Sequence, residues 1–172
     1  MPIFCLTGPE STGKSTLCEA LAEHFGGAWV AEYAREYVEK LGRKYNFRDV
    51  CHIARKQIEQ LNEAKNSDSK FIFFDTDLII TKVWFEHCFN KIPLFVENYL
   101  KKPVIDCYLL CFPDIEWQND IVRENGTEQQ RQFLFHWYKR EIEKTGKPFY
   151  IIKGKGEKRL QNAINSVNLF LK

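Results

Sequence analysis

The sequence predicts an α/β domain in which a parallel β-sheet lies between two layers of helices. Short apolar runs bounded by turn residues alternate along the chain with longer segments whose apolar residues recur at helical spacing. Such alternation is typical of a parallel sheet that is covered on both faces. In addition, a glycine-rich turn joins the first apolar run to the first helical segment, which is the order expected of a phosphate-binding loop.

Five apolar runs are the predicted strands, and they cover residues 3–7, 28–31, 71–74, 107–112 and 149–152. Each run is short, apolar on both faces and bounded by turn residues, as buried parallel strands are. We therefore expect all five strands to be fully buried.

Helical stripes of apolar residues lie between and after these strands, over residues 17–25, 50–61, 133–142 and 160–171. Asp49 stands directly ahead of the second stripe and is a possible N-cap. A further helix is expected to start near Leu78, and Asp75 or Asp77 could cap it. The leucine and aromatic residues of the stripes are interpreted as core faces.

Size and charge exclude several classes of protein. A chain of 172 residues suits a single domain over residues 1–172 with a sizeable core. A net charge of +2 is too small to indicate nucleic acid or an acidic membrane as a partner. No apolar run is long enough to span a bilayer, and no signal peptide is apparent, so we expect a cytoplasmic protein.

The six cysteines are expected to be reduced thiols. No two of them have C-x-x-C spacing, and no Cys/His cluster has the spacing of a zinc site. Cys5, Cys107 and Cys111 lie inside apolar strand-like runs, where thiols are usually buried and inert.

Residues 8–15 match the phosphate-loop pattern G-x-x-x-x-G-K-[ST] at every fixed position. Glycine lets the backbone fold around phosphate oxygens, and backbone N–H groups at a helix N-terminus attract the anion. Lys14 is expected to reach the β- and γ-phosphates of ATP, and the Ser15 hydroxyl to ligate Mg²⁺. The predicted ATP-binding residues of this loop are Gly8, Glu10, Ser11, Thr12, Gly13, Lys14, Ser15 and Thr16.

Acidic residues follow two of the predicted strands, at the edge of the sheet where ligands of α/β proteins bind. Asp75 ends the third strand, and a run of four apolar residues would bury it unless it opened on a site. A carboxylate there could take the proton of an acceptor hydroxyl or help to hold Mg²⁺. Asp77 and Glu32 are weaker candidates, because acidic residues commonly cap helices.

Residues 113–130 are predicted to form a lid. The segment is polar and charged, lacks periodicity and lies between a strand and a helix. Arg123 within it could place positive charge over the transferring phosphoryl group, and Arg131 follows at the start of the next helix as a further ATP-binding candidate. The alternative is a solvated charged loop.

Several aromatic residues fall on the expected acceptor side of the site: Tyr33, Tyr37, Trp84 and Trp117. A flat cationic ring would be attracted to their faces. Each of them alone is a common kind of core residue, so the set is weak evidence for a nucleoside-like acceptor.

Together these segments resemble the ribosylnicotinamide kinase domain of NadR-type proteins and the related NadR-like P-loop ATPases. The matching stretches are residues 7–16, 30–35, 74–78, 81–84, 113–120 and 123–125, and they follow one another in the family's order. The multidomain members carry a helix-turn-helix and an adenylyltransferase domain ahead of the kinase. The first predicted strand here follows directly on Met1, so we expect neither.

This resemblance implies a nucleoside-kinase-like fold with strand order 2-3-1-4-5. It also implies transfer of the γ-phosphate of Mg²⁺-bound ATP to the 5'-hydroxyl of nicotinamide riboside, which gives nicotinamide mononucleotide for NAD salvage. Asp75, Lys14 and Arg123 are then the expected catalytic residues, and Ser15 and Asp75 the residues at the metal. The expected acceptor-binding residues are Glu32, Tyr33, Arg35, Asp77, Trp84, Trp117 and Asp120.

Two other readings stay open at the level of sequence. One is a kinase for a different nucleoside or a vitamin-like alcohol. The other is a regulatory module in which a phosphate loop binds or hydrolyses ATP to drive recognition of a partner. Asp75 at a strand end and an arginine in the predicted lid favour phosphoryl transfer over binding alone.

Overall fold

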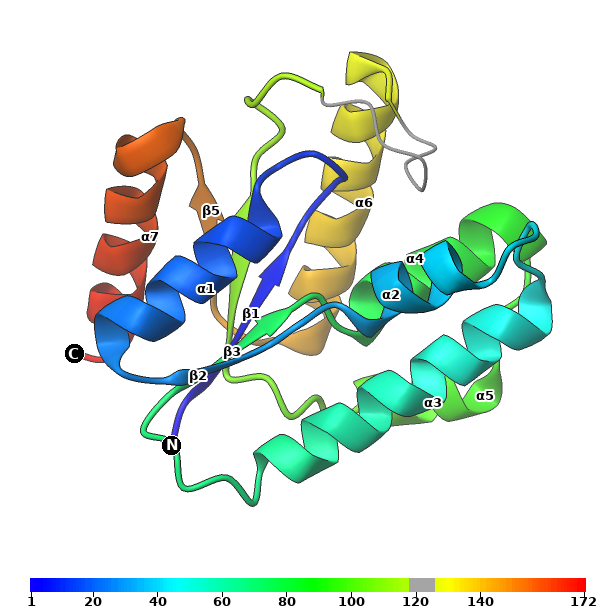
Figure 1. Cartoon of the computed structure of the whole chain (residues 1–172), viewed down its shortest axis with the longest axis horizontal. Coiled ribbons are helices and arrows are strands. Elements are labelled where there is room, and N and C mark those ends of the chain that lie inside the picture. The colour runs from blue at the N-terminus through cyan, green and yellow to red at the C-terminus, as the bar shows by residue number, and fades with distance from the viewer. Residues whose placement is uncertain (118–125) are drawn as a thin grey trace.

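A parallel sheet of five strands forms the centre of the molecule (Figure 1). The computed structural model describes residues 1–117 and 126–172. The strands are β1 (Ile3–Thr7), β2 (Ala28–Val30), β3 (Ile72–Asp75), β4 (Cys107–Cys111) and β5 (Phe149–Ile152). They stand in the order β2-β3-β1-β4-β5 and every neighbouring pair is parallel. The α/β class and the implied strand order are therefore confirmed.

Helices cover both faces of this sheet. Those formed by the described residues are α1 (Lys14–Phe25), α2 (Tyr33–Lys40), α3 (Phe47–Ala64), α4 (Leu78–Phe89), α5 (Leu94–Leu100), α6 (Glu128–Thr145) and α7 (Gly156–Phe170). Alternate residues of each strand point to opposite faces, so the side chains of the sheet contribute to two separate hydrophobic cores. Phe4 and Leu6 of β1 pack with α1 and α7, whereas Ile3 and Cys5 pack with the layer of α3 to α6.

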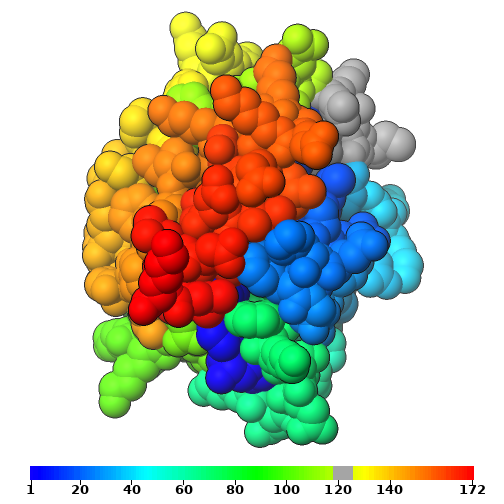
Figure 2. Space-filling model, turned by 90° about the vertical axis from the view of Figure 1, so that its left-hand side faces the viewer, coloured from blue at the N-terminus to red at the C-terminus, as the bar shows by residue number. Residues whose placement is uncertain are grey.

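The two helices of the smaller layer lie against each other. Figure 2 shows α7, in orange and red, beside the blue α1 over one face of the molecule. Leu17 and Leu21 of α1 and Val167 of α7 are buried in this core, which agrees with their predicted stripes. This packing fixes the direction of α1, whose N-terminus carries the glycine-rich loop.

The outer strands differ from the prediction. Trp29 of β2 is 41% exposed and Ile151 of β5 is also exposed, although both runs were expected to be buried. The strand order gives the reason, because β2 and β5 are the edges of the sheet and each has a strand neighbour on one side only. The central strands β1, β3 and β4 are buried along their whole length, as predicted.

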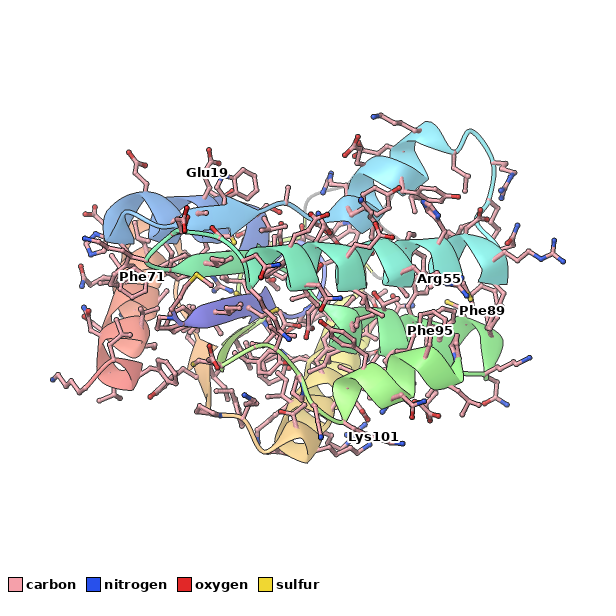
Figure 3. All side chains as sticks on the ribbon, turned by 90° about the horizontal axis from the view of Figure 1, so that it is seen from below. Glu19, Arg55, Phe71, Phe89, Phe95 and Lys101 are labelled. Atoms are coloured by element: carbon pink, nitrogen blue, oxygen red, sulfur yellow. The ribbon has the colours of Figure 1, made fainter. Side chains whose placement is uncertain are left out.

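Two helices, α2 and α5, have no counterpart in the predicted pattern. Helix α2 buries only Ala34 and α5 only Val96, so neither presents a continuous apolar stripe. Helix α5 packs on α4 and also contacts α3, where the guanidinium carbon of Arg55 lies 4.7 Å from the centre of the Phe95 ring (Figure 3).

The start of α3 also corrects a prediction. Asn46, not Asp49, is the N-cap, and its side chain accepts hydrogen bonds from the N–H groups of Arg48 and Asp49. Asp49 lies three residues further on and closes a capping box by accepting from the backbone N–H of Asn46 at 2.7 Å. Arg43 holds the same carboxylate with two hydrogen bonds, so Asp49 ties the connection between α2 and α3 to the helix.

The register of the central strands brings the candidate site residues together. Leu6 pairs with Asp75, and the N–H of Thr76 donates to the carbonyl oxygen of Leu6 at 2.9 Å. The last residues of β1 and β3 are therefore neighbours, and both chains leave the sheet at the same edge. Within the described part of the chain, no helix is both long and apolar enough to cross a bilayer.

Candidate active site

The glycine-rich loop between β1 and α1 has the backbone of a phosphate cradle. Gly8, Ser11 and Gly13 have φ values of 137°, 57° and 71°, which are all in the left-handed half of conformational space. Gly13 is the N-cap of α1 and has no side chain that could cap the helix. The first turn of α1 holds no acidic residue either. The N–H groups of that turn are therefore directed at the loop and favour an anion.

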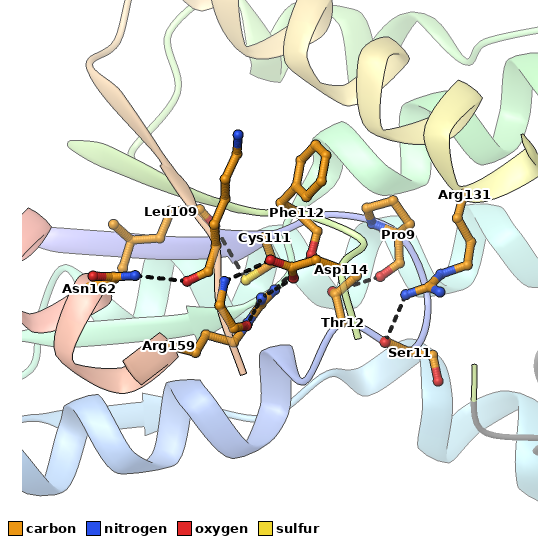
Figure 4. Close-up of polar contacts among 12 residues, drawn as sticks. Pro9, Ser11, Thr12, Leu109, Cys111, Phe112, Asp114, Arg131, Arg159 and Asn162 are labelled. Carbon is orange, nitrogen blue, oxygen red and sulfur yellow. Dashed lines mark hydrogen bonds and ion pairs between the residues drawn. The ribbon is translucent and has the colours of Figure 1, made fainter. Parts of the chain in front are cut away.

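Inside the loop, the carbonyl oxygen of Pro9 accepts two hydrogen bonds. The Thr12 hydroxyl donates to it at 2.9 Å (Figure 4), and so does the ammonium group of Lys14, also at 2.9 Å. Lys14 thus bends back over the loop, and its charge lies within the cradle where phosphate oxygens would bind.

Arg131 approaches the same loop from α6. Its Nη2 donates to the carbonyl oxygen of Ser11 at 3.0 Å (Figure 4), and its Nε donates to that of Glu10 at 3.2 Å. The side chain is only 4% exposed. Arg131 was predicted to bind ATP, and the structure places its guanidinium against the backbone of the glycine-rich loop.

A cleft of about 1030 Å³ opens in front of the loop. The predicted site residues that line it are Gly8, Glu10, Ser11, Thr12, Gly13, Lys14, Ser15, Thr16, Glu32, Arg35 and Trp84. The loop residues line one part of the cleft, and α2 and α4 contribute a second part.

Asp75 ends β3 behind the phosphate loop, is 3% exposed and borders a small recess beside the cleft. The Ser15 side chain hydrogen-bonds to it, whereas its Oδ1 atom has no hydrogen-bond partner among the described residues. Burial raises the pKa of Asp75, and the nearby charge of Lys14 opposes the shift. A buried carboxylate oxygen without a partner is costly, so this atom is available to a ligand.

Glu32 is the second acidic group of the cleft. Burial raises its pKa to about 7, against the lowering effect of Lys14. Asp75 contributes to the increase, so the two carboxyls are close enough to oppose each other's ionisation.

Asp77 takes the capping role that the sequence left open. Its Oδ1 accepts from the N–H of Ile79 at 3.1 Å at the start of α4, and its Oδ2 accepts from the Tyr108 hydroxyl at 3.0 Å. Burial raises its pKa to about 6. Asp77 is 2% exposed and both of its carboxylate oxygens are bonded, which argues against its predicted contact with an acceptor.

An aromatic wall forms the far part of the cleft. Trp84 and Tyr45 meet edge to face, with their ring centres 4.7 Å apart. Cys88 and His87 of α4 and Tyr138 of α6 complete the wall. Of these residues only Trp84 was predicted, although Trp84 and Cys88 are four positions apart and so share a helix face.

Tyr33 faces elsewhere. Its hydroxyl is 2.9 Å from Nε2 of His52, and it borders a separate small recess with Gln57 and Asp75. The predicted stacking of Tyr33 in the acceptor site is therefore not supported by its position. Tyr37 also lies away from the cleft, with its hydroxyl donating to Asp49.

A second buried arginine, Arg159, also lines the cleft. The Nη1 atom of Arg159 donates to Asp114 at 2.6 Å and to the carbonyl oxygen of Gly154 at 2.8 Å (Figure 4). The Asp114 carboxylate also accepts from the N–H of Gly154 at 2.7 Å. This network joins the loops that follow β4 and β5. Sequence reasoning missed it, because Asp114 and Arg159 are 45 positions apart and no local pattern links them.

The predicted lid is only partly covered by the structure. Residues 113–117 form no helix or strand, and α6 begins at Glu128, so the last residues of the predicted segment are helical. Trp117 is partly buried, and a Cβ atom on Gly126 would lie 2.9 Å from its ring, so the two segments flanking residues 118–125 are in contact. Asp120 and Arg123 lie outside the described residues.

The fold and this geometry can be compared with known proteins. Residues 3–159 match the model of the family AAA_28, described as an AAA domain. The chain is 28% identical over 141 residues to the trifunctional NAD biosynthesis/regulator protein NadR of Escherichia coli, and this alignment covers 76% of the chain and 34% of that protein. The NadR protein of Salmonella typhimurium matches over the same share. The chain thus spans about a third of the length of these curated relatives.

Solved structures show the same fold. A NadR protein in complex with NR superimposes with a TM-score of 0.84 at 24% identity, over 98% of this chain and 51% of that one. Deoxyadenosine kinase from M. mycoides, solved with the products dCMP and dCDP, gives a TM-score of 0.65 at 15% identity, over 97% and 99% of the two chains. At these identities the two structures support the P-loop kinase fold and its strand order.

Proposed function

This chain belongs to the AAA_28 family of AAA domains, and we propose that it is an ATP-dependent kinase that phosphorylates the 5'-hydroxyl of nicotinamide riboside. The product would be nicotinamide mononucleotide, and the reaction would serve NAD salvage in the cytoplasm. The observation that carries the proposal is the position of Asp75. This buried carboxylate lies beside the phosphate loop and has an oxygen with no hydrogen-bond partner in the described part of the chain.

The phosphate end of the cleft suits the triphosphate of ATP. Lys14 and the N-terminus of α1 converge on the loop, and the left-handed backbone at Gly8, Ser11 and Gly13 turns its N–H groups toward one point. Such a cradle stabilises anions through its backbone N–H groups. The residues that line it also include Glu10, Thr12 and Thr16.

The residues present fit a magnesium ion. Ser15 supplies a hydroxyl at the start of α1 and Asp75 a carboxylate hydrogen-bonded to it, and both are oxygen ligands of the kind that Mg²⁺ prefers. Bound there with ATP, Mg²⁺ would neutralise charge on the phosphates. The partnerless oxygen of Asp75 supports this assignment, because a buried carboxylate is best stabilised by a nearby cation.

We assign the role of general base to Asp75. A kinase needs a carboxylate that orients the acceptor hydroxyl and takes its proton. Glu32 also faces the loop, but burial raises its pKa to about 7, so a large share of it is protonated at neutral pH. A carboxyl with a pKa near the working pH can also exchange protons, so Glu32 is the second candidate for the base, and its protonated form could donate to a ribose hydroxyl beside Arg35.

The aromatic wall supports a flat, cationic acceptor. Trp84 and Tyr45 form a right-angled corner in the cleft. The nicotinamide ring of nicotinamide riboside carries a positive charge, and cation–π attraction would favour it over a neutral base. The choice of nicotinamide rests mainly on the likeness to NadR proteins, one of which was solved with NR. Trp117, Asp120 and Arg123 keep their predicted roles as parts of the proposal, with Arg123 stabilising charge on the transferring group.

Acceptor-dependent release of ADP tests this proposal. Purified protein would be incubated with Mg-ATP and, separately, with nicotinamide riboside, uridine, adenosine or thymidine. We expect ADP release to rise well above the acceptor-free rate with nicotinamide riboside and less with the neutral nucleosides. Release that no acceptor increases would contradict kinase function, and faster release with a neutral nucleoside would overturn only the choice of acceptor.

A further inference from the structure

The contact between Arg131 and the phosphate loop involves two successive backbone carbonyls. Nε and Nη2 lie on the same edge of the planar guanidinium, and they donate to the carbonyl oxygens of Glu10 and Ser11. An arginine edge is suited to two adjacent acceptors, because its donors have a fixed spacing. The side chain therefore fixes the orientation of two peptide groups at once.

These two bonds also determine where the neighbouring N–H groups point. In a trans peptide the C=O and N–H bonds point in opposite directions, and the peptide bonds of the described residues include no cis form. Because the carbonyls of Glu10 and Ser11 face Arg131, the N–H groups of Ser11 and Thr12 face away from it. Those N–H groups belong to the cradle that would hold phosphate oxygens.

The backbone at this point needs support. Ser11 has a φ of 57°, and a non-glycine residue in this region is strained by about 1 kcal/mol. The Thr12 hydroxyl and Lys14 stabilise the preceding carbonyl, that of Pro9, from within the loop. Arg131 lies outside the loop, and it supports the strained turn by bonding to the carbonyl oxygens of Glu10 and Ser11.

The start of α6 fixes Arg131 in turn. Thr127 is the N-cap of the helix, and its hydroxyl accepts from the N–H of Gln130 at 3.1 Å. The Gln130 side chain accepts from the N–H of Thr127 at 3.2 Å and completes a capping box. The capping box therefore stabilises the first turn of α6, from which Arg131 extends.

We propose that Arg131 is a positioning residue that orients the N–H groups of Ser11 and Thr12 for the phosphates of the nucleotide and does not itself touch the transferring phosphoryl group. This inference rests on the proposed function only in requiring that the loop bind a nucleoside triphosphate. Its consequence is that loss of Arg131 weakens ADP and ATP alike, because both place phosphates in the same cradle.

Binding measurements on three variants test this role. Arg131→Gln removes the charge, and Arg131→Lys keeps the charge but cannot bond two adjacent carbonyls in the fixed geometry of a guanidinium edge. Arg140→Gln makes the same substitution at an exposed position of the same helix and is the matched control. Dissociation constants for ADP and ATP would be measured by calorimetry without any acceptor, so that the outcome does not depend on which acceptor is correct.

We expect Arg131→Lys and Arg131→Gln to raise both dissociation constants by a similar factor, on the order of 10- to 100-fold, and Arg140→Gln to leave them unchanged. Without nucleotide, hydrogen exchange in the peptide covering residues 8–16 should be faster in Arg131→Lys than in the wild type. Exchange in peptides from the five strands should be the same in both proteins. Arg131→Lys retains the charge and is the variant to rely on if Arg131→Gln does not fold.

Three results would overturn the proposal. The first is a fall in turnover at saturating ATP with both dissociation constants unchanged, which would mean direct contact with the transition state. The second is weaker binding of ATP with ADP unaffected, which would mean contact with the γ-phosphate. The third is unchanged exchange of residues 8–16 in Arg131→Lys, which would mean that the arginine does not hold the loop.

Discussion

A Cβ atom on Gly8 would lie 2.6 Å from the carbonyl oxygen of Cys111, so the first glycine of the phosphate loop packs directly on the end of β4. The sequence explained this glycine by the room that phosphate oxygens need. The structure shows that a neighbouring strand already requires it. At Gly13 a Cβ atom would make only an ordinary contact of 3.5 Å with Ile115, so the left-handed backbone is what favours glycine there.

Gly8→Ala should therefore prevent folding or lower the free energy of unfolding by more than about 3 kcal/mol, since a backbone carbonyl cannot move aside cheaply. Gly42→Ala is the matched control. Its φ of 64° is also left-handed, but a Cβ there would have no described atom within 4 Å, so only the backbone strain of about 1 kcal/mol applies. Urea denaturation measures both. Equal destabilisation by the two substitutions would show that the contact with β4 is unimportant.

Lys14→Ala should fold normally and lose turnover by about 10³-fold, because its ammonium group would no longer reach the phosphates. Lys40→Ala is a suitable control, because that lysine forms an exposed ion pair with Glu36 on α2. Thermal melting would establish that both variants fold, and a coupled ADP assay would give their rates. Near-wild-type turnover in folded Lys14→Ala protein would rule out a phosphate-binding role.

Glu32 should make stability depend on pH. Burial raises its pKa to about 7 from an ordinary value near 4.5, so the folded state binds a proton more tightly than the unfolded state. Its favourable contribution is complete below about pH 4.5 and is lost as pH rises through 7. Glu32→Gln should therefore melt a few degrees higher than the wild type at pH 8, with a difference that shrinks toward pH 4.5. Thermal melts across this range measure the effect, and a difference that grew toward low pH would contradict the assigned shift.

Cys88 should be the one thiol that reacts quickly in the native protein. It is exposed and lines the aromatic part of the cleft, whereas Cys51 is half-buried. The other four cysteines are buried, and burial raises the pKa of each of them. Ellman's reagent should give a single fast phase that Cys88→Ser abolishes and that nicotinamide riboside slows. Several fast thiols, or a fast phase that persists in Cys88→Ser, would contradict this arrangement.

Much of the fold could be predicted because its strands are short apolar runs between turns. The predicted strands agree with the observed ones to within one residue at each end. Helix α2 was missed because it buries only Ala34, and its remaining positions carry no apolar period. Phe133 of the predicted α6 stripe is 52% exposed, because it contacts Trp137 and His87 at the surface rather than the core.

In the candidate site, too, local sequence features could be predicted and contacts between distant residues could not. The phosphate loop is local in sequence, so its pattern alone located it. Asp75 and Asp77 are two residues apart at the end of one strand, and the sequence could not tell which would contact the phosphate loop and which would cap α4. That choice depends on the hydroxyl of Tyr108, a distant residue on β4 that bonds Asp77. The network of Arg159 and Asp114 is likewise a product of tertiary structure.

Direct detection of nicotinamide mononucleotide would show both which acceptor is used and whether Asp75 is needed for transfer. Wild-type protein, Asp75→Asn and the exposed control Asp68→Asn would each be incubated with Mg-ATP and nicotinamide riboside, and nicotinamide mononucleotide would be quantified by mass spectrometry. We expect the wild type and Asp68→Asn to form nicotinamide mononucleotide and ADP in equal amounts. Asp75→Asn should bind ATP and form product about a hundredfold more slowly or worse. Absence of nicotinamide mononucleotide with active wild-type protein would contradict the acceptor, and full turnover by Asp75→Asn would contradict the proposed role of this carboxylate.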